Sequence, residues 1–264
     1  WQEILLNQFH DILPGSSIKE VYEDSQQSYE KILKDSRRRT ENSLRNLTAH
    51  IDAPQHSVAV FNPNSFEGPG IVSFECPEAM ENPGLWDGEK EIPLQNTEGR
   101  TYIFTAQGVP SKGYKTYMLK ESGSSEAPSM DIHTGYMEND YFRIEYNEKG
   151  QFSRIWDKKA QREVLKEGQA GNVIVSYEDR PHNYDAWDLN NYYTEKSWEI
   201  DDVSSIEVTE NGPVRGCVRI ERKYLDSLIV QDIYIYRDIP RIDIANHIDW
   251  REHQIFVKDH FPVD

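Results

Sequence analysis

Residues 7–16 read Asn-Gln-Phe-His-Asp-Ile-Leu-Pro-Gly-Ser, and this stretch sets the layout of the first part of the chain. Apolar residues at spacings of three and four predict one helix over residues 1–13. Pro14-Gly15 ends it, because proline lacks an amide hydrogen and glycine accepts the left-handed backbone of a helix C-terminus. No capping residue precedes the helix, so we expect the chain to have been cut from a longer protein. The apolar face comprises Trp1, Ile4, Leu5, Phe9 and Ile12.

A second helix is predicted from Ser17 to about His50. Residues 17–20, Ser-Ile-Lys-Glu, fit a capping box, in which the serine and glutamate side chains satisfy backbone amides of the first turn. At about 1.5 Å per residue the helix would be roughly 50 Å long, and its apolar stripe would need a helical partner. The arginines at 37–39 could bind anions, but the surrounding acidic residues favour a solvated helix face.

Beyond Pro54 apolar and polar residues alternate, which is typical of strands. Short strands between turn residues predict a small antiparallel sandwich at 54–122. The Asp-Gly pair within 86–89 predicts a hairpin turn, and the Ser- and Gly-rich residues 121–128 predict a linker. The strands are expected at 57–61, 71–76, 101–104 and 114–119.

Residues 136–264 predict a larger antiparallel sandwich, so the expected fold class is α+β and mostly β, with a helical segment at 1–53. Glycine at the end of residues 147–150 suits a hairpin turn. Residues 260–264 have a strand pattern without a closing turn, so we expect this sandwich to be truncated. Its strands are predicted at 141–146, 152–157, 172–177, 206–208, 214–224, 228–236 and 241–250.

The 264 residues carry a formal net charge of −17. An acidic surface repels phosphates, so we expect neither a nucleic-acid nor a membrane partner. Cys76 and Cys217 match no metal-ligand spacing and no disulfide scaffold. No apolar run approaches the roughly 18 residues of a transmembrane helix, and no signal peptide is present. The lack of a signal peptide is uninformative if the true N-terminus is missing. The expected compartment is the cytoplasm, and a homo-oligomer is a possible assembly.

His10 and Asp11 form the first candidate site. A neutral imidazole is a common metal ligand, and a neighbouring carboxylate can bind a metal or a hydroxyl. A catalytic zinc needs about three protein ligands, whereas this stretch supplies one or two. Taken alone, the residues favour a helix end with a solvated aspartate and a half-buried histidine.

Residues 179–193 form the second candidate site, a polar segment with three tyrosines, one tryptophan, one histidine and three aspartates. Sugar sites combine aromatic faces with carboxylates, which makes Asp185, Trp187, Asp188 and Tyr192 candidate substrate-binding residues. An ordered surface loop with turn-capping aspartates explains the same composition, and the residues alone favour it. His182 has no metal-ligand partner at a usual spacing and is not assigned.

Residues 7–18, NQFHDILPGSSI, resemble a signature segment of glycoside hydrolase family 38, the class II α-mannosidases. Later segments are similar to the same family in the same order: VFNP at 60–63, GYKTY at 113–117, REVL at 162–165, DAWD at 185–188 and HFPVD at 260–264. The resemblance implies that the larger sandwich is a mutarotase-like supersandwich and that the loop at 179–193 reaches the rim of the catalytic site.

The resemblance also implies roles for residues. His10 matches the last zinc ligand of the family, and Asp11 matches the carboxylate that contacts bound mannose. The other zinc ligands, the nucleophile and the acid/base belong to an upstream catalytic domain in that family. We therefore expect a fragment of a retaining zinc-dependent α-mannosidase acting on mannose-containing oligosaccharides, with the isolated chain inactive and free of zinc.

Two other functions stay open at this point. The chain could be a noncatalytic carbohydrate-binding or structural β module, or a helical and β scaffold that mediates assembly. Glycan binding by the chain alone would favour the first of these. Activity of the same region joined to its natural upstream sequence would favour the enzyme.

Overall fold

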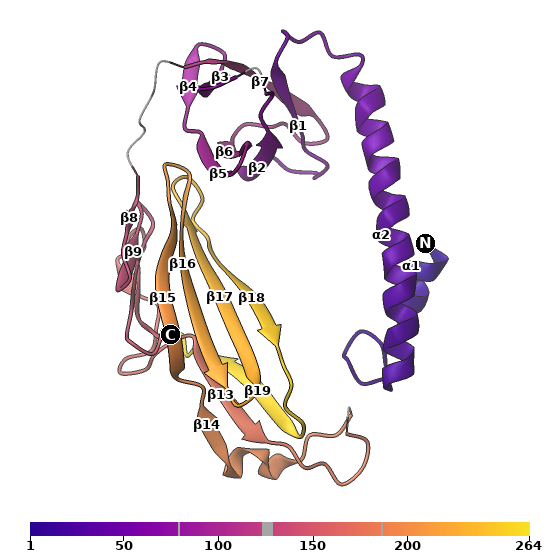
Figure 1. The fold of residues 1–264 in the computed structure, drawn as a ribbon, viewed down its shortest axis with the longest axis vertical. Helices are drawn as coiled ribbons and strands as arrows, with labels where there is room; N and C mark the ends of the chain where they lie inside the picture. The colour runs from indigo at the N-terminus through magenta and orange to yellow at the C-terminus, as the bar shows by residue number, and fades with distance from the viewer. Residues whose placement is uncertain (79, 123–128, 186) are drawn as a thin grey trace. The chain divides into compact units, whose positions relative to one another are not determined.

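The computed structural model describes residues 1–78, 80–122, 129–185 and 187–264 (Figure 1). It divides into two compact units, one of residues 1–52 with 177–197 and one of residues 53–176 with 198–264. Two helices are followed by short and long antiparallel strands, so the predicted fold class, α+β and mostly β, is confirmed. None of the described helices has the length and hydropathy that crossing a bilayer requires.

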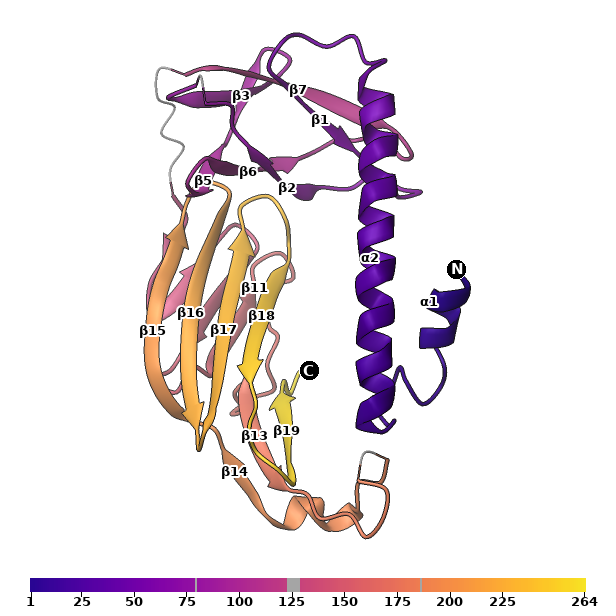
Figure 2. The same cartoon turned by 45° about the vertical axis from the view of Figure 1, so that its right-hand side comes forward.

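The first unit contains α1 (Gln2–Asn7) and α2 (Lys19–Thr48), which lie side by side (Figure 2). The helix predicted over 1–13 is wrong beyond Asn7. The Asn7 side-chain amide donates to the Glu3 carbonyl at 2.8 Å and competes with the helical backbone bond, and residues 10–14 form turns instead. The same amide donates to the Ser28 hydroxyl at 2.9 Å, so the end of α1 is fixed to α2.

The predicted capping box at 17–20 is wrong as well. α2 begins at Lys19, its N-cap is Ile18, and no side chain caps it. The Ser17 hydroxyl instead donates to the carbonyl of Asp11 at 2.6 Å. The helix ends at Thr48, close to the predicted end.

The small sandwich at the start of the second unit packs two sheets, β1-β7-β3-β4 and β2-β6-β5, around one apolar core. The predicted hairpin turn joins β3 to β4, with Gly88 at φ +62°. The predicted linker residues 123–128 lie outside the described part. The strands are β1 (Ser57–Phe61), β2 (Gly70–Glu75), β3 (Pro83–Asp87), β4 (Lys90–Ile92), β5 (Gln95–Glu98), β6 (Thr101–Ala106) and β7 (Tyr114–Glu121).

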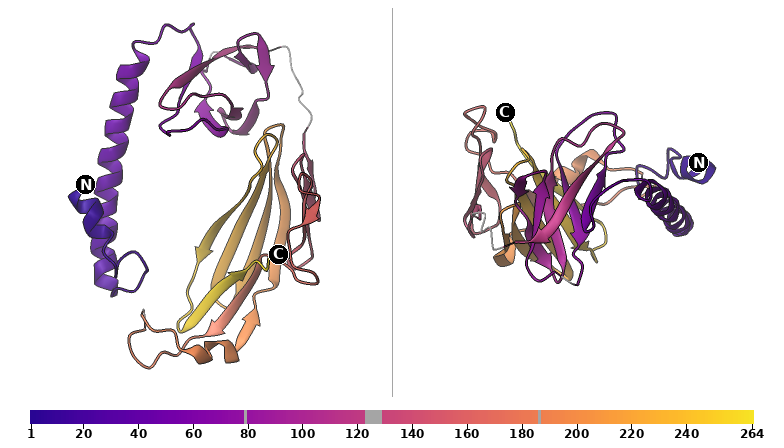
Figure 3. Two further views of the ribbon diagram at one scale, coloured as in Figure 1. Left: turned by 180° about the vertical axis from the view of Figure 1, so that it is seen from behind. Right: turned by 90° about the horizontal axis from the view of Figure 1, so that it is seen from above.

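The large sandwich packs the sheet β12-β11-β10-β9-β8 on one face of the sheet β15-β16-β17-β18 (Figures 1 and 3). Alternate residues of β16 and β17, such as Val218, Ile220 and Ile233, are fully buried between these sheets. A third sheet, β14-β13-β19, has its own small core. The last strand is β19 at 255–260, earlier than the pattern at 260–264 predicted.

The strands of the large sandwich are β8 (Asp131–Ile132), β9 (Tyr136–Glu138), β10 (Phe142–Tyr146), β11 (Phe152–Asp157), β12 (Arg162–Glu163), β13 (Val173–Glu178), β14 (Ser197–Glu199), β15 (Asp202–Asn211), β16 (Arg215–Tyr224), β17 (Ser227–Tyr236), β18 (Ile242–Asp249) and β19 (Ile255–His260), with a 3-10 helix η1 (Asn191–Glu195) before β14.

Arg222 is buried inside the large sandwich, with 1% of its surface exposed. Its guanidinium donates to the carbonyls of Lys149 and Gly150, and to the Gln231 side-chain oxygen at 2.6 Å. Burial lowers the pKa of Arg222 to about 10, against the opposing charge of Asp259. A side chain at Gly150 would clash with the guanidinium, whose Nη2 would lie 2.5 Å from the added Cβ. Gly150 also takes φ +68°, so both its backbone angle and the space beside Arg222 favour glycine at this turn.

Gln95 connects the small sandwich to the turn between β15 and β16. Its side-chain oxygen accepts hydrogen bonds from the amides of Val214 and Arg215 at 3.0 and 2.9 Å. Its side-chain amide donates to Glu210 at 3.1 Å, and Gln95 itself is 6% exposed. A Cβ at Gly212 would lie 2.1 Å from the Gln95 side chain, so this position requires glycine.

Candidate functional site

The first candidate site lies in the turn that follows α1. Gln8 closes the helix, the amides of Ile12 and Leu13 donate to the Phe9 carbonyl, and Gly15 takes φ +82°. His10 and Asp11 therefore stand outside the helix. Adjacent residues within a helix diverge by about 100°. Because the helix has ended, these two side chains can approach each other.

The side chains of His10 and Asp11 do come together. Nε2 of His10 lies 3.6 Å from Oδ2 of Asp11, and the histidine side chain is 75% exposed. The other carboxylate oxygen, Oδ1 of Asp11, is buried and has no hydrogen-bond partner among the described residues. A buried carboxylate oxygen without a donor is costly. The turn therefore offers an accessible imidazole next to a carboxylate oxygen that lacks a donor.

This pair can contribute to a metal site but cannot complete one. An imidazole nitrogen and a carboxylate oxygen are both zinc ligands. Among residues 1–78, 80–122, 129–185 and 187–264, no three histidine, cysteine or acidic side chains converge as a metal cluster would require. His182 accordingly joins no metal cluster within this part of the chain. Any zinc held at His10 needs further ligands.

The predicted sugar-binding residues Asp185, Trp187, Asp188 and Tyr192 share the loop at 179–193. The Trp187 and Asp188 amides donate to the Tyr184 carbonyl, which makes a tight turn. Burial, and secondly the charge of Asp185, raises the pKa of Asp179. The Tyr192 hydroxyl donates to the Arg180 carbonyl at 3.1 Å and ties the end of the loop to its start.

Two aromatic side chains of this loop, Tyr184 and Trp187, are exposed, whereas Tyr193 packs edge-on against Tyr177 of β13. Trp187 is 61% exposed, and Tyr184 is 76% exposed with φ +59°. A left-handed backbone is unfavourable for a tyrosine and is frequent at functional sites. Tyr184 was not among the predicted residues, because no sequence pattern reports the backbone angle of a single tyrosine. The loop presents aromatic faces and the exposed carboxylates of Asp185 and Asp188 to solvent.

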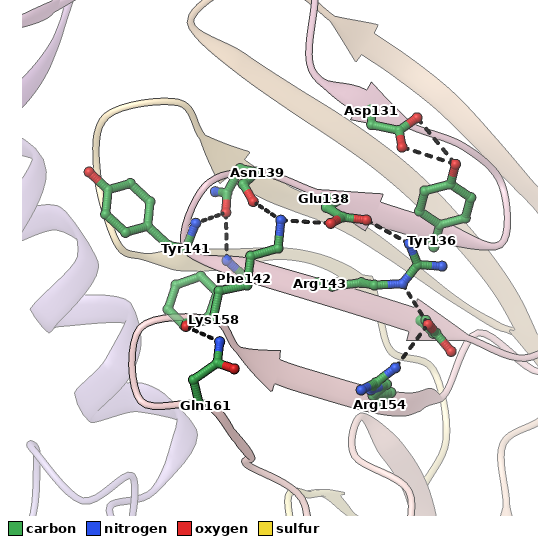
Figure 4. A network of polar contacts seen from close by, with 11 residues as sticks. Asp131, Tyr136, Glu138, Asn139, Tyr141, Phe142, Arg143, Arg154, Lys158 and Gln161 are labelled. Atoms are coloured by element: carbon green, nitrogen blue, oxygen red, sulfur yellow. Dashed lines mark hydrogen bonds and ion pairs between the residues drawn. The ribbon is translucent and has the colours of Figure 1, made fainter.

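A third polar cluster covers the outer face of the β8–β12 sheet (Figure 4). Arg143 bonds to Glu138 and Glu145, each at 2.6 Å, and Lys158 bonds to the second oxygen of Glu138. Arg154 forms a further ion pair with Glu145 at 3.6 Å. These charges neutralise one another across neighbouring strands, as in a structural ion-pair network. We therefore assign no ligand to this cluster.

Comparisons with known families agree with the fold. Residues 137–264 match the glycosyl hydrolases family 38 C-terminal domain, and residues 1–47 match the alpha mannosidase middle domain. The chain belongs to glycoside hydrolase family 38 and is homologous to α-mannosidases. The His10–Asp11 turn lies within the part that matches the middle domain.

Individual relatives are distant, but each match covers at least 96% of this chain. Alpha-mannosidase G of Dictyostelium discoideum is 26% identical over 96% of this chain and 26% of its own length. Alpha-mannosidase 2C1 of Homo sapiens is 25% identical over 100% of this chain and 24% of its own length. The crystal structure of an alpha-mannosidase from Enterococcus faecalis V583 superposes with a TM-score of 0.74 at 15% identity, covering 97% of this chain and 37% of that chain. The chain thus spans about a quarter of the length of these curated relatives.

Proposed function

We propose that the chain forms the middle and C-terminal part of a retaining, zinc-dependent α-mannosidase that hydrolyses mannose-containing oligosaccharides. The observation that carries this proposal is the His10 imidazole beside Asp11, whose buried Oδ1 lacks a donor, in a chain of family 38. The remaining zinc ligands and the two reacting carboxyl groups would come from an upstream catalytic domain. The proposed compartment is the cytoplasm, where the free thiols of Cys76 and Cys217 are the usual form of cysteine.

The residues of this chain have binding roles in the proposal. His10 would hold zinc through one ring nitrogen, and the Asp11 carboxylate would accept a hydrogen bond from a sugar hydroxyl. Bound zinc supplies Lewis-acid binding of sugar hydroxyls. A retaining hydrolase needs a nucleophilic carboxylate and an acid/base carboxyl about 5–5.5 Å apart. Both would lie outside the present chain, which orients the sugar rather than reacting with it.

The test compares chain 1–264 with the same chain joined to its natural upstream sequence. We expect the joined protein to bind zinc and hydrolyse an aryl α-mannoside, and the isolated chain to show no turnover, because the two-carboxylate mechanism requires groups that it lacks. Hydrolysis by the isolated chain that is abolished by His10→Ala would contradict the proposed division of roles. An inactive joined protein without zinc would contradict the function itself.

We also propose that the loop at 179–193 binds a sugar unit through Trp187, Tyr192, Asp185 and Asp188. The support is the exposure of the Trp187 face next to two exposed carboxylates. Stacking of one aromatic ring on a sugar contributes about 1 kcal/mol or more. The Trp187→Ala substitution in the joined protein should therefore raise KM for an oligosaccharide about fivefold or more, with kcat little changed.

The matched control is Trp198→Ala, which removes a tryptophan of similar exposure, 50%, from β14 outside the loop. It should leave KM unchanged. Equal KM values for the parent and for Trp187→Ala would show that the loop does not bind the substrate. Glycan binding by the isolated chain that is lost with Trp187→Ala would favour the noncatalytic carbohydrate-binding module instead.

A further inference from the structure

Hydroxyl groups of three residues converge on the backbone of the His10–Asp11 turn, and the longest of these contacts joins the Ser16 hydroxyl to the Asp11 carbonyl at 3.5 Å. The Ser17 hydroxyl donates to the Asp11 carbonyl at 2.6 Å. The Tyr22 hydroxyl, from the first turn of α2, lies 3.3 Å from the carbonyls of both Asp11 and Ile12. The Ser17 amide in turn donates to the Tyr22 hydroxyl at 3.0 Å. Tyr22 and Ser17 thus form one connected anchor for this turn.

The hydrogen bond of Ser17 in this anchor takes the place of the helix cap that the sequence predicts for α2. Ser17 is placed to cap α2, and a serine cap usually stabilises a helix. In the structure no side chain caps α2, because the Ser17 hydroxyl faces the Asp11 carbonyl instead. Local rules are typically broken where a site imposes its own geometry.

We propose that Tyr22 and Ser17 are positioning residues, which fix the backbone of Asp11 so that His10 and Asp11 point at the same bound sugar and metal. This inference rests on the proposed function. An aspartate side chain has only two rotatable bonds, so the position of its backbone largely decides where Oδ1 lies. Binding and catalysis tolerate displacements well below about 1 Å. Neither residue touches the ligand in this proposal, and both act through Asp11.

The first arm of the test needs no zinc. In chain 1–264, Tyr22→Phe removes only the hydroxyl that accepts from the Ser17 amide. We expect hydrogen exchange of the Ser17 amide to accelerate about tenfold, the effect of losing one hydrogen bond. Tyr29→Phe, on the same helix, is the control and should leave this exchange unchanged. An unchanged exchange rate in Tyr22→Phe would show that the anchor does not exist.

The second arm measures zinc affinity in the joined protein by competition with a chelator. Tyr22→Phe and Ser17→Ala should each weaken zinc binding about tenfold or more and lower kcat, as substitutions beside metal ligands do. Ser17→Thr keeps the hydroxyl and should restore both. A purely structural role would lower the melting temperature and leave zinc affinity unchanged, which would overturn the proposal. If the parent itself binds no zinc, the proposed function fails and the positioning role fails with it, whereas the exchange arm still reports the anchor.

Discussion

The His10→Ala substitution in the joined protein should abolish stoichiometric zinc binding and lower kcat/KM about a thousandfold or more. The fold should change little, because His10 lies in an exposed turn where its side chain is 75% solvent-accessible. Metal analysis, steady-state kinetics and a thermal unfolding curve on the same preparation measure the three effects together. Zinc content and activity equal to those of the parent would remove the strongest reason for the proposed function.

The Asp11→Asn substitution separates the two roles at this turn. It replaces one carboxylate oxygen by an amide without removing the imidazole, so zinc should remain bound while activity falls. The control is His50→Ala, which removes a second exposed histidine from the same helical segment. His50→Ala should retain both zinc and activity. Loss of zinc in Asp11→Asn would make Asp11 a metal ligand rather than a sugar contact.

The Arg222→Ala substitution should lower the free energy of unfolding of the isolated chain by about 3–5 kcal/mol. It leaves the Lys149 carbonyl without its donor, and it removes one of two donors from the Gly150 carbonyl and from the Gln231 side-chain oxygen, to which Asn172 still donates. It also opens a cavity inside the sandwich. Urea unfolding followed by intrinsic fluorescence measures the change in midpoint. Removing the guanidinium also removes the cost of burying its charge, and this offsets part of the lost free energy of unfolding.

The neighbouring residue provides the control for this stability measurement. Lys223 follows Arg222 on β16, points to the opposite face of the sheet and is exposed. Lys223→Ala should change the free energy of unfolding by no more than about 0.5 kcal/mol. Arg222→Met retains much of the side-chain volume, so its loss of free energy of unfolding should lie between those of Arg222→Ala and Lys223→Ala. An Arg222→Ala chain within about 1 kcal/mol of the parent would show that the buried guanidinium contributes little net stability.

Periodicity predicted the strands with the clearest alternation. The core strands β16 and β17 and the turn at 147–150 appear where the pattern placed them, because their alternate apolar residues face one buried layer. β5 was not predicted, because its residues, Gln-Asn-Thr-Glu, are all polar. Its one buried residue, Gln95, bonds to residues more than a hundred positions away. Arg222 was equally unpredictable, since arginine is rarely buried.

Sequence patterns alone also could not identify the candidate site. The family resemblance singled out His10 and Asp11, and spacing alone could not, since the two residues provide only part of a metal site. The helix and cap rules failed at Asn7 and Ser17, where side chains bond to nearby backbone groups that regular helix geometry would use. These failures lie beside the proposed binding residues. Local deviations of this kind can help to locate a site.

The Gln95 contacts also set an order of events during synthesis. Its partners Glu210, Val214 and Arg215 follow it by 115, 119 and 120 residues, so the contacts cannot form until most of the large sandwich has left the ribosome. Contacts so distant in sequence close slowly, because a long loop must be ordered before they form. The small sandwich can therefore form its own core before its attachment to β15 and β16 is completed.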